Sequence, residues 1–231
     1  MSAETRFWLL RTGSVAAILG SILSGVGNAL HPITPRDDPE GVAQVIADSD
    51  AWTLIHVGIL VGILLMLIGI VAFRYAIEGG RAEALARFGA YTGIIGATTG
   101  LITIVLDGVA AKQLADAWAA APEAEKSVAL GLVSTNETLN FALAGLFNMG
   151  FAGVPFTFLG LAVAESGTFP RWFGWIGAIA GVGSIGAGMF QMFTGKPTVA
   201  SLILTIIGPT VIVIWTLVMG VMVGRRAARV T

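Results

Sequence analysis

Six long apolar stretches constrain what this chain can fold into. A hydrocarbon core of about 30 Å needs roughly 20 residues of helix to cross it. The stretches are continuously apolar and do not alternate with polar residues, which favours helices over a β-barrel. The sequence therefore predicts an all-α fold in which residues 1–231 form a single six-helix transmembrane domain. The predicted spans are Phe7–Leu30, Trp52–Ile77, Phe88–Ala111, Glu137–Ala164, Arg171–Phe193 and Val199–Val223.

The composition supports a membrane protein and excludes several kinds of chemistry. Only 12% of the residues are charged, whereas soluble domains carry about 25%. The net charge of −1 gives no reason to expect a nucleic-acid partner. The chain has no cysteine, which excludes disulfides, thiolate catalysis and cysteine-ligated clusters. Its two histidines are too few for a metal site made of histidine alone.

The placement of lysine and arginine predicts the orientation of the chain in the membrane. If the N-terminus is cytoplasmic, nine of these residues lie in cytoplasmic segments and four in outer segments. Cytoplasmic loops carry the excess of positive charge, so we expect a multi-pass protein of the cell membrane with both termini cytoplasmic. The nine are Arg6, Arg11, Arg74, Arg81, Arg87, Arg171, Arg225, Arg226 and Arg229, and the four are Arg36, Lys112, Lys126 and Lys196.

Two outer loops are expected to contain short amphipathic helices. The segment Asp38–Ile46 begins with an Asp-Pro pair, typical of an N-cap and first helical turn, and continues with apolar residues at helical spacing. Pro122–Val133 has the pattern of a second surface helix. The sequence "STNE" at Ser134–Glu137 follows it and is typical of a capping box, which predicts that span four begins there.

Polar side chains inside the spans are few, and most of them fall near the outer ends. An ionisable group at the centre of a membrane helix costs up to about 3 kcal/mol, so each one is a functional hypothesis. We expect these residues to line one outward-facing polar cavity that takes a small-molecule ligand. The predicted ligand-binding residues are His31, His56, Asp107, Glu137, Asn140 and Gln191.

Three of these residues suggest a metal site. Two imidazoles and a carboxylate, from His31, His56 and Asp107, are a ligand set that zinc, copper or iron uses. Two histidines on different helices are also an arrangement that grips a haem from both faces. These polar residues also have structural explanations. His31 precedes a proline at a helix end, and Glu137 has a role in the capping box. The cofactor therefore stays open.

The spans also contain small residues four positions apart, which let helix backbones approach closely. These faces allow a homo- or hetero-oligomer, although packing within one chain explains them as well. The pairs are Ser21/Gly25, Gly89/Gly93, Gly96/Gly100, Gly177/Gly181 and Ser184/Gly188.

Three short motifs connect the chain to a known family. They are "LHP" at Leu30–Pro32, the Trp52/His56 pair that opens span two, and "PRWFGWIG" at Pro170–Gly177. In these motifs the chain resembles an uncharacterised family of bacterial and archaeal six-span membrane proteins, grouped as a domain of unknown function. The resemblance implies the six-span fold and names no reaction, cofactor or site residue.

Two functional hypotheses follow from the residues. The first is a non-enzymatic membrane protein that binds or moves a small solute through the outer cavity, or an accessory subunit of such a system. The alternative is a metal- or haem-binding redox protein that uses His31, His56 and Asp107. The sequence shows no nucleophile–base arrangement and no phosphate-binding loop, so it gives little reason to expect an enzyme.

Overall fold

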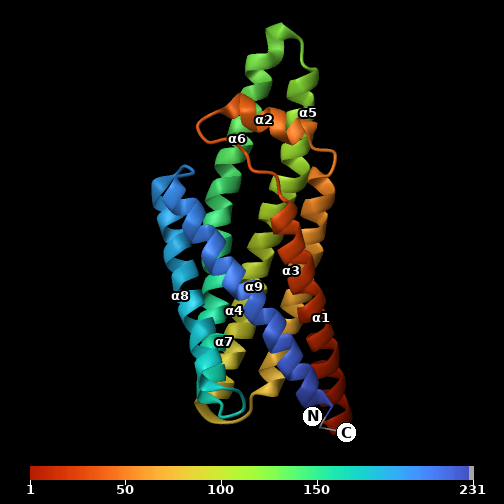
Figure 1. Ribbon diagram of the computed structural model, residues 1–231, viewed down its shortest axis with the longest axis vertical. Helices are drawn as coiled ribbons and strands as arrows, with labels where there is room; N and C mark the ends of the chain where they lie inside the picture. The colour runs from red at the N-terminus through yellow and green to blue at the C-terminus, as the bar shows by residue number, and fades with distance from the viewer. Residues whose placement is uncertain (229–231) are drawn as a thin grey trace.

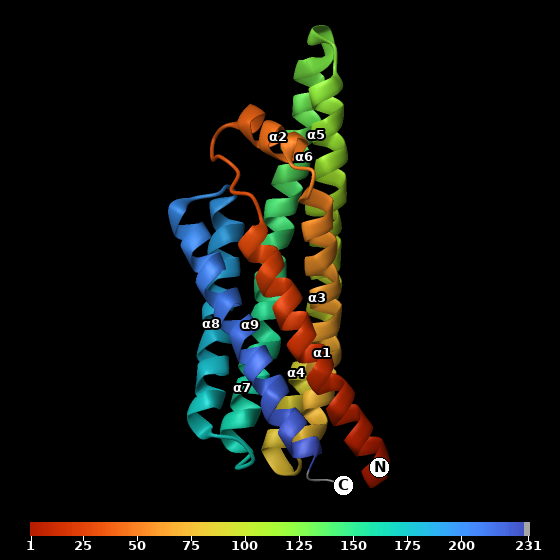
Figure 2. The ribbon, with the colours of Figure 1, turned by 45° about the vertical axis from the view of Figure 1, so that its right-hand side comes forward.

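A computed structural model of the protein describes residues 1–228, which form helices joined by short loops (Figures 1 and 2). Six continuous helical segments are long and apolar enough to cross a membrane, which confirms the predicted all-α, six-span fold. The helices are α1 (Ala3–Leu30), α2 (Pro39–Asp48), α3 (Trp52–Phe73), η1 (Arg74–Ala76), α4 (Gly80–Val105), η2 (Leu106–Ala110), α5 (Ala111–Ala120), α6 (Glu123–Phe147), η3 (Asn148–Gly153), α7 (Val154–Glu165), α8 (Arg171–Thr194) and α9 (Val199–Ala227).

Two of the helical segments are much longer than a bilayer requires. Gly80–Ala120 and Glu123–Glu165 are continuous over 41 and 43 residues. At 1.5 Å per residue each reaches about 60 Å, twice the hydrocarbon thickness. Their α5 and α6 ends therefore project beyond the other helices (Figure 1).

This continuity corrects the prediction of a second surface helix. Pro122–Val133 is not a separate element, and no helix begins at Ser134–Glu137, because α6 runs through both segments without a break. The projecting part of α6 packs against α5 and α2 through a small apolar cluster of Ala43, Trp118 and Val133. This tertiary contact keeps the segment helical where the local capping pattern predicts a start.

The first predicted surface helix is confirmed as α2, which lies across the end of the bundle (Figure 2). Asp38 caps it, since its Oδ1 accepts a hydrogen bond of 2.9 Å from the backbone N–H of Gly41. Its buried Ile46 packs on Trp52 of α3 and Ala115 of α5. We call this end of the bundle the α2 end, and the opposite end, where α1 begins and α9 ends, the terminal end (Figure 1).

The small residues of the spans pack against neighbouring helices of the same chain. A Cβ on Gly96 of α4 would lie 2.0 Å from the carbonyl oxygen of Gly150. A Cβ on Gly181 of α8 would lie 2.4 Å from the backbone nitrogen of Thr157. Close approach of backbones is what small residues permit in lipid, where the hydrophobic effect does not drive association. Intrachain packing therefore accounts for these glycines without a second chain.

Candidate metal centre

A π-helical turn shapes the α2 end of the bundle. The turn is η2, which joins α4 to α5 and contains Asp107. A π-helical turn displaces backbone carbonyls from the regular hydrogen-bond pattern, and such turns occur frequently at functional sites. Three consecutive carbonyls of this turn accept hydrogen bonds from side chains of other helices. Asn136 Nδ2 donates to Leu106 at 3.3 Å, Trp52 Nε1 to Asp107 at 2.7 Å, and Thr53 Oγ1 to Gly108 at 3.1 Å.

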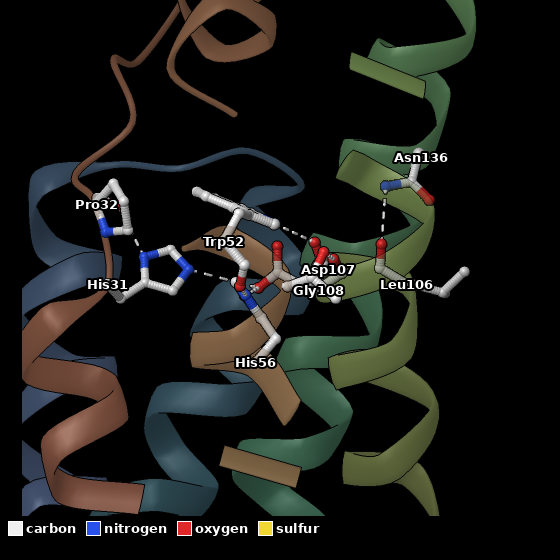
Figure 3. A network of polar contacts seen from close by, with 9 residues as sticks. His31, Pro32, Trp52, His56, Leu106, Asp107, Gly108 and Asn136 are labelled. Carbon is white, nitrogen blue, oxygen red and sulfur yellow. Dashed lines mark hydrogen bonds and ion pairs between the residues drawn. The ribbon is translucent and has the colours of Figure 1, made fainter. Parts of the chain in front are cut away.

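These bonds fix the position of Asp107 from two sides. Trp52 and Thr53 belong to the first turn of α3, whereas Asn136 belongs to α6. The backbone of η2 is therefore tied to both neighbouring helices without any use of the Asp107 carboxylate. That leaves the carboxylate free to face the interior of the site (Figure 3).

Two histidines meet this carboxylate. His56 Nε2 lies 3.2 Å from Asp107 Oδ2, and His31 Nε2 lies 3.9 Å from the same oxygen. The two imidazole rings are in edge contact, with centroids 4.9 Å apart, and His31 reaches the site from the end of α1 (Figure 3). One ligand atom from each of the three residues lies within 4.8 Å of the others. We call His31, His56 and Asp107 the His–Asp cluster.

Both imidazoles are oriented through their second ring nitrogen. His56 Nδ1 lies 2.7 Å from the backbone carbonyl of Trp52, and His31 Nδ1 lies 2.8 Å from that of Pro32. A carbonyl oxygen only accepts, so the proton of each neutral ring sits on Nδ1 and Nε2 presents a lone pair. An Nδ1–H bonded to a backbone carbonyl is the arrangement that orients metal-ligating histidines.

The His–Asp cluster therefore directs three acceptor atoms toward one point. His56 Nε2 is buried against the Asp107 carboxylate, with which it forms a hydrogen bond only when this nitrogen carries a proton. A lone pair that faces a carboxylate oxygen needs a positive charge between them, which either a proton or a metal ion supplies. The cluster holds a buried lone pair, a second imidazole and a carboxylate, and these are the donor types that divalent transition metals prefer.

The separations suit one ion bound to all three residues. A tetrahedral ion with bonds of about 2.1 Å holds its ligand atoms about 3.4 Å apart. The contact between His56 and Asp107 already has this length, while His31 lies farther out. His31 follows the last residue of α1 and starts the loop to α2, so its backbone is not held within a helix. Three protein ligands leave a fourth coordination position open, as in catalytic zinc sites.

Burial favours the metal-binding form of the outermost ligand. Desolvation lowers the pKa of His31 below its usual value, and the opposing attraction of Asp107 is the smaller effect. The neutral imidazole is the form that coordinates a metal. The side chain of His56 is almost completely buried, whereas those of His31 and Asp107 are about a quarter exposed. The exposed side of the cluster is therefore the side that His31 and Asp107 form.

Two cavities meet at the His–Asp cluster. The first has a volume of about 410 Å³ and is lined by His31 and Asp107 together with Glu137, Asn140 and Gln191. The second has a volume of about 590 Å³ and is lined by all three members of the cluster. The structure thus places all six residues predicted from the sequence on two spaces that share His31 and Asp107.

Glu137 and Asn140 differ from Gln191 in how they are bonded. Gln191 Oε1 accepts from Asn148 Nδ2 at 3.1 Å, and Gln191 Nε2 donates to the carbonyl of Phe141 at 3.0 Å. Both ends of this amide are therefore used within the protein. By contrast, Glu137 Oε1 and Asn140 Oδ1 are buried without a hydrogen-bond partner in the described chain. The predicted capping role of Glu137 is wrong, because α6 continues through this residue.

Sequence reasoning missed the residues that hold the turn. Trp52 and Thr53 begin α3 one turn before His56, a spacing that places Trp52 and His56 on one helix face. Gly108 directly follows Asp107, and a Cβ there would lie 2.2 Å from the Cβ of His56. A polar aromatic residue one turn before a histidine, and a glycine next to an aspartate inside a predicted span, are the signals that point to such a site.

The fold defines the protein as a multi-pass helical membrane protein, and one end of its bundle brings together two histidines and an aspartate. The chain matches the family described as domain of unknown function DUF4386 over residues 12–220, and it belongs to that family. The match includes the whole His–Asp cluster and confirms the resemblance seen in the sequence motifs. Neither a curated protein nor a solved structure matches the chain.

Proposed function

We propose that this membrane protein holds a divalent transition-metal ion at the α2 end, with His31, His56 and Asp107 as ligands. The observation that carries the proposal is the convergence of two Nε2 atoms on one carboxylate oxygen, with both Nδ1 atoms bonded to carbonyls. Two histidines and a carboxylate with an open position are a ligand set of zinc and of non-haem iron. Of the two sequence hypotheses, the distances favour the metal protein.

The geometry does not favour a haem between the two histidines. An axial pair holds the porphyrin between its rings, so the rings lie on opposite faces of a large flat ligand. Here the rings of His31 and His56 are in edge contact, and both direct Nε2 at Asp107. A single ion fits between these atoms, whereas a porphyrin requires the helices to separate.

We also propose that the α2 end lies outside the cell membrane and that both termini are cytoplasmic. Eight of the nine arginines predicted to be cytoplasmic fall at the terminal end, within the first three turns of α1, α4 and α8, on η1 and at the end of α9. The ninth, Arg229, lies outside the described residues. This distribution is the one that the positive-inside rule expects.

A second candidate function is the binding of a small solute in the first cavity. Its volume of about 410 Å³ falls within the range of small-molecule sites, and it adjoins the metal ligands. A solute there reaches the open coordination position of the ion. Metal binding and solute binding are thus two parts of one site.

The test of the metal proposal is a titration of the purified protein. The only histidines of the chain are those of the cluster, so tag-free protein has no other imidazole. After removal of metal with a chelator, isothermal titration with Zn²⁺ or Co²⁺ is expected to show one ion per chain. His56→Ala and Asp107→Asn are expected to weaken binding by about 100-fold or more.

The matched control is Asp116→Asn, which removes an exposed carboxylate on α5 that pairs with Lys112. This variant is expected to bind the ion like the unmodified protein. The proposal fails if the protein binds no ion, or if the two ligand variants bind it as tightly as the control does.

A further inference from the structure

We propose that the first cavity binds a small solute with a protonated amine at one end and an oxyanion at the other. Glu137 and Asn140 receive the amine, and the oxyanion occupies the open coordination position of the ion. The amine half depends only on residues of α6. The oxyanion half rests on the metal function proposed above.

The amine position follows from two acceptor atoms that the fold leaves unused. Glu137 and Asn140 are three residues apart on α6, so their side chains project from the same helix face. Glu137 Oε1 and Asn140 Oδ1 are both buried, have no hydrogen-bond partner among the described residues, and belong to residues that line the cavity. A buried acceptor without a donor is costly, and an ammonium group supplies three donors with a positive charge.

The Glu137 carboxylate is available for this role because it does not belong to the metal cluster. The ligand atoms that lie close enough to share an ion come from His31, His56 and Asp107 alone among the described residues. Glu137 nevertheless lines the same cavity as His31 and Asp107. The lining of the cavity therefore contains two distinct polar groups: the His–Asp cluster and the Glu137–Asn140 pair.

The cavity lining also includes apolar side chains, which suit a short hydrocarbon chain. Val133, Phe141 and Leu202 also line the cavity and provide apolar side chains. The cavity volume of about 410 Å³ accommodates a small ligand. Gln191 contributes to the wall but offers no free group, since both ends of its amide are bonded within the protein. The ligand class is thus a short zwitterion whose charges are joined by methylene groups.

The experiment uses a homologous series as probes, from glycine through β-alanine and 4-aminobutyrate to 6-aminohexanoate. Each ω-amino acid is compared by isothermal titration with the carboxylate that lacks the amine and with the alkylamine that lacks the carboxylate. On Zn²⁺-loaded protein, one chain length is expected to bind at least tenfold more tightly than either fragment. On Co²⁺-loaded protein, the carboxylate is expected to shift the visible spectrum of the ion.

Two variants assign the amine position. Glu137→Gln is expected to abolish the preference for the amine while Zn²⁺ affinity stays unchanged, which also shows that the variant is folded. Asn140→Asp retains the acceptors and adds a negative charge, so it is expected to strengthen the preference. Glu125→Gln, an exposed position on the same helix, is the matched control and is expected to change nothing.

Titration of the metal-free protein with alkylamines distinguishes failure of the amine position from failure of the metal function. If no ion binds but alkylamines bind in a Glu137-dependent way, the metal function is wrong and the amine position stands. If Zn²⁺ binds but no amino acid binds more tightly than its amine-free partner, the amine position is wrong. A preference for the amine that remains in Glu137→Gln also contradicts the proposed amine position. Glu137 Oε1 and Asn140 Oδ1 then bind water only.

Discussion

Gly108 of η2 and His56 of α3 are in such close contact that a Cβ on the glycine would lie 2.2 Å from the Cβ of the histidine. The absence of a side chain at this position lets α3 approach the π-helical turn. The same approach places His56 Nε2 next to the carboxylate of Asp107. The position of the imidazole therefore depends on a residue that has no side chain.

The first prediction concerns this contact. Gly108→Ala is expected to displace His56, to weaken Zn²⁺ binding at least tenfold, and to lower the free energy of unfolding by about 1–3 kcal/mol through overpacking. Metal titration and thermal denaturation in detergent measure the two effects. The control is Gly58→Ala on the same helix as His56, where an added Cβ meets nothing within 4 Å. Equal effects of the two variants would contradict the prediction.

The second prediction tests whether the hydrogen bond from Trp52 to η2 affects metal binding in addition to the stability of the fold. Trp52→Phe removes the donor to the Asp107 carbonyl, and Trp215→Phe removes the donor of a similar 2.9 Å bond to the carbonyl of Phe173. Each variant leaves a carbonyl without its donor and is expected to cost about 1–3 kcal/mol. Only Trp52→Phe is expected to weaken metal binding as well. Loss of metal affinity in the Trp215 variant would show that the effect is not local.

The third prediction concerns the hydrogen bond between Asn148 of η3 and Gln191 of α8. Gln191→Met leaves the Asn148 amide without its buried acceptor, and Asn148→Leu leaves Gln191 without its donor. Each change is expected to lower the free energy of unfolding by about 1–3 kcal/mol. The double variant is expected to lose less than the sum, because one bond joins the two side chains. Additive losses in thermal denaturation would show that the two amides do not depend on each other.

The fourth prediction is the pH dependence of metal binding. Protons compete with the ion for imidazole, so affinity is expected to fall as the pH falls. Burial lowers the pKa of His31, which keeps this ring neutral to a lower pH than a free imidazole with a pKa of about 6.5. Loss of the Co²⁺ absorption is therefore expected as the pH falls through the range in which the imidazoles take up protons. Binding that is constant between about pH 7.5 and 5 would exclude histidine ligands.

The fifth prediction concerns orientation in the membrane. The chain has no cysteine, so single cysteines are labelled without background. Glu125→Cys on the projecting part of α6 is expected to react with a membrane-impermeant maleimide in intact cells. Glu78→Cys, an exposed position at the terminal end, is expected to react only after permeabilisation. The reverse pattern would place the His–Asp cluster on the cytoplasmic side.

The membrane spans were predictable from the sequence because they depend on the lipid that surrounds them. Lipid satisfies no backbone groups, so a run such as Trp52–Ile77 has few alternatives to a helix. The ends of helices that lie outside the membrane were less predictable. The pattern "STNE" at Ser134–Glu137 is a good local start signal, yet α6 continues through it because Val133 packs against Ala43 and Trp118. Such contacts between distant segments do not appear in a local motif.

The polar residues of the His–Asp cluster were predictable from the sequence. The residues that hold the η2 turn in place were not. His56 and Asp107 stood out because ionisable residues in a span need a reason, and each lies about one turn from a predicted span end. The π-helical turn has no comparable signature, since Leu106–Ala110 reads as an ordinary helical segment. The roles of Trp52 and Thr53 depend on that turn, so they became visible only with the structure.

The donors that hold η2 in place, Trp52, Thr53 and Asn136, are not members of the His–Asp cluster. The framework of the site and its reactive atoms are therefore different parts of the protein. A single side chain of the His–Asp cluster can therefore be replaced while the backbone of η2 keeps its hydrogen bonds. If the cluster holds an ion as proposed, a change in one of its side chains alters the ligand set without altering the bonds that hold η2.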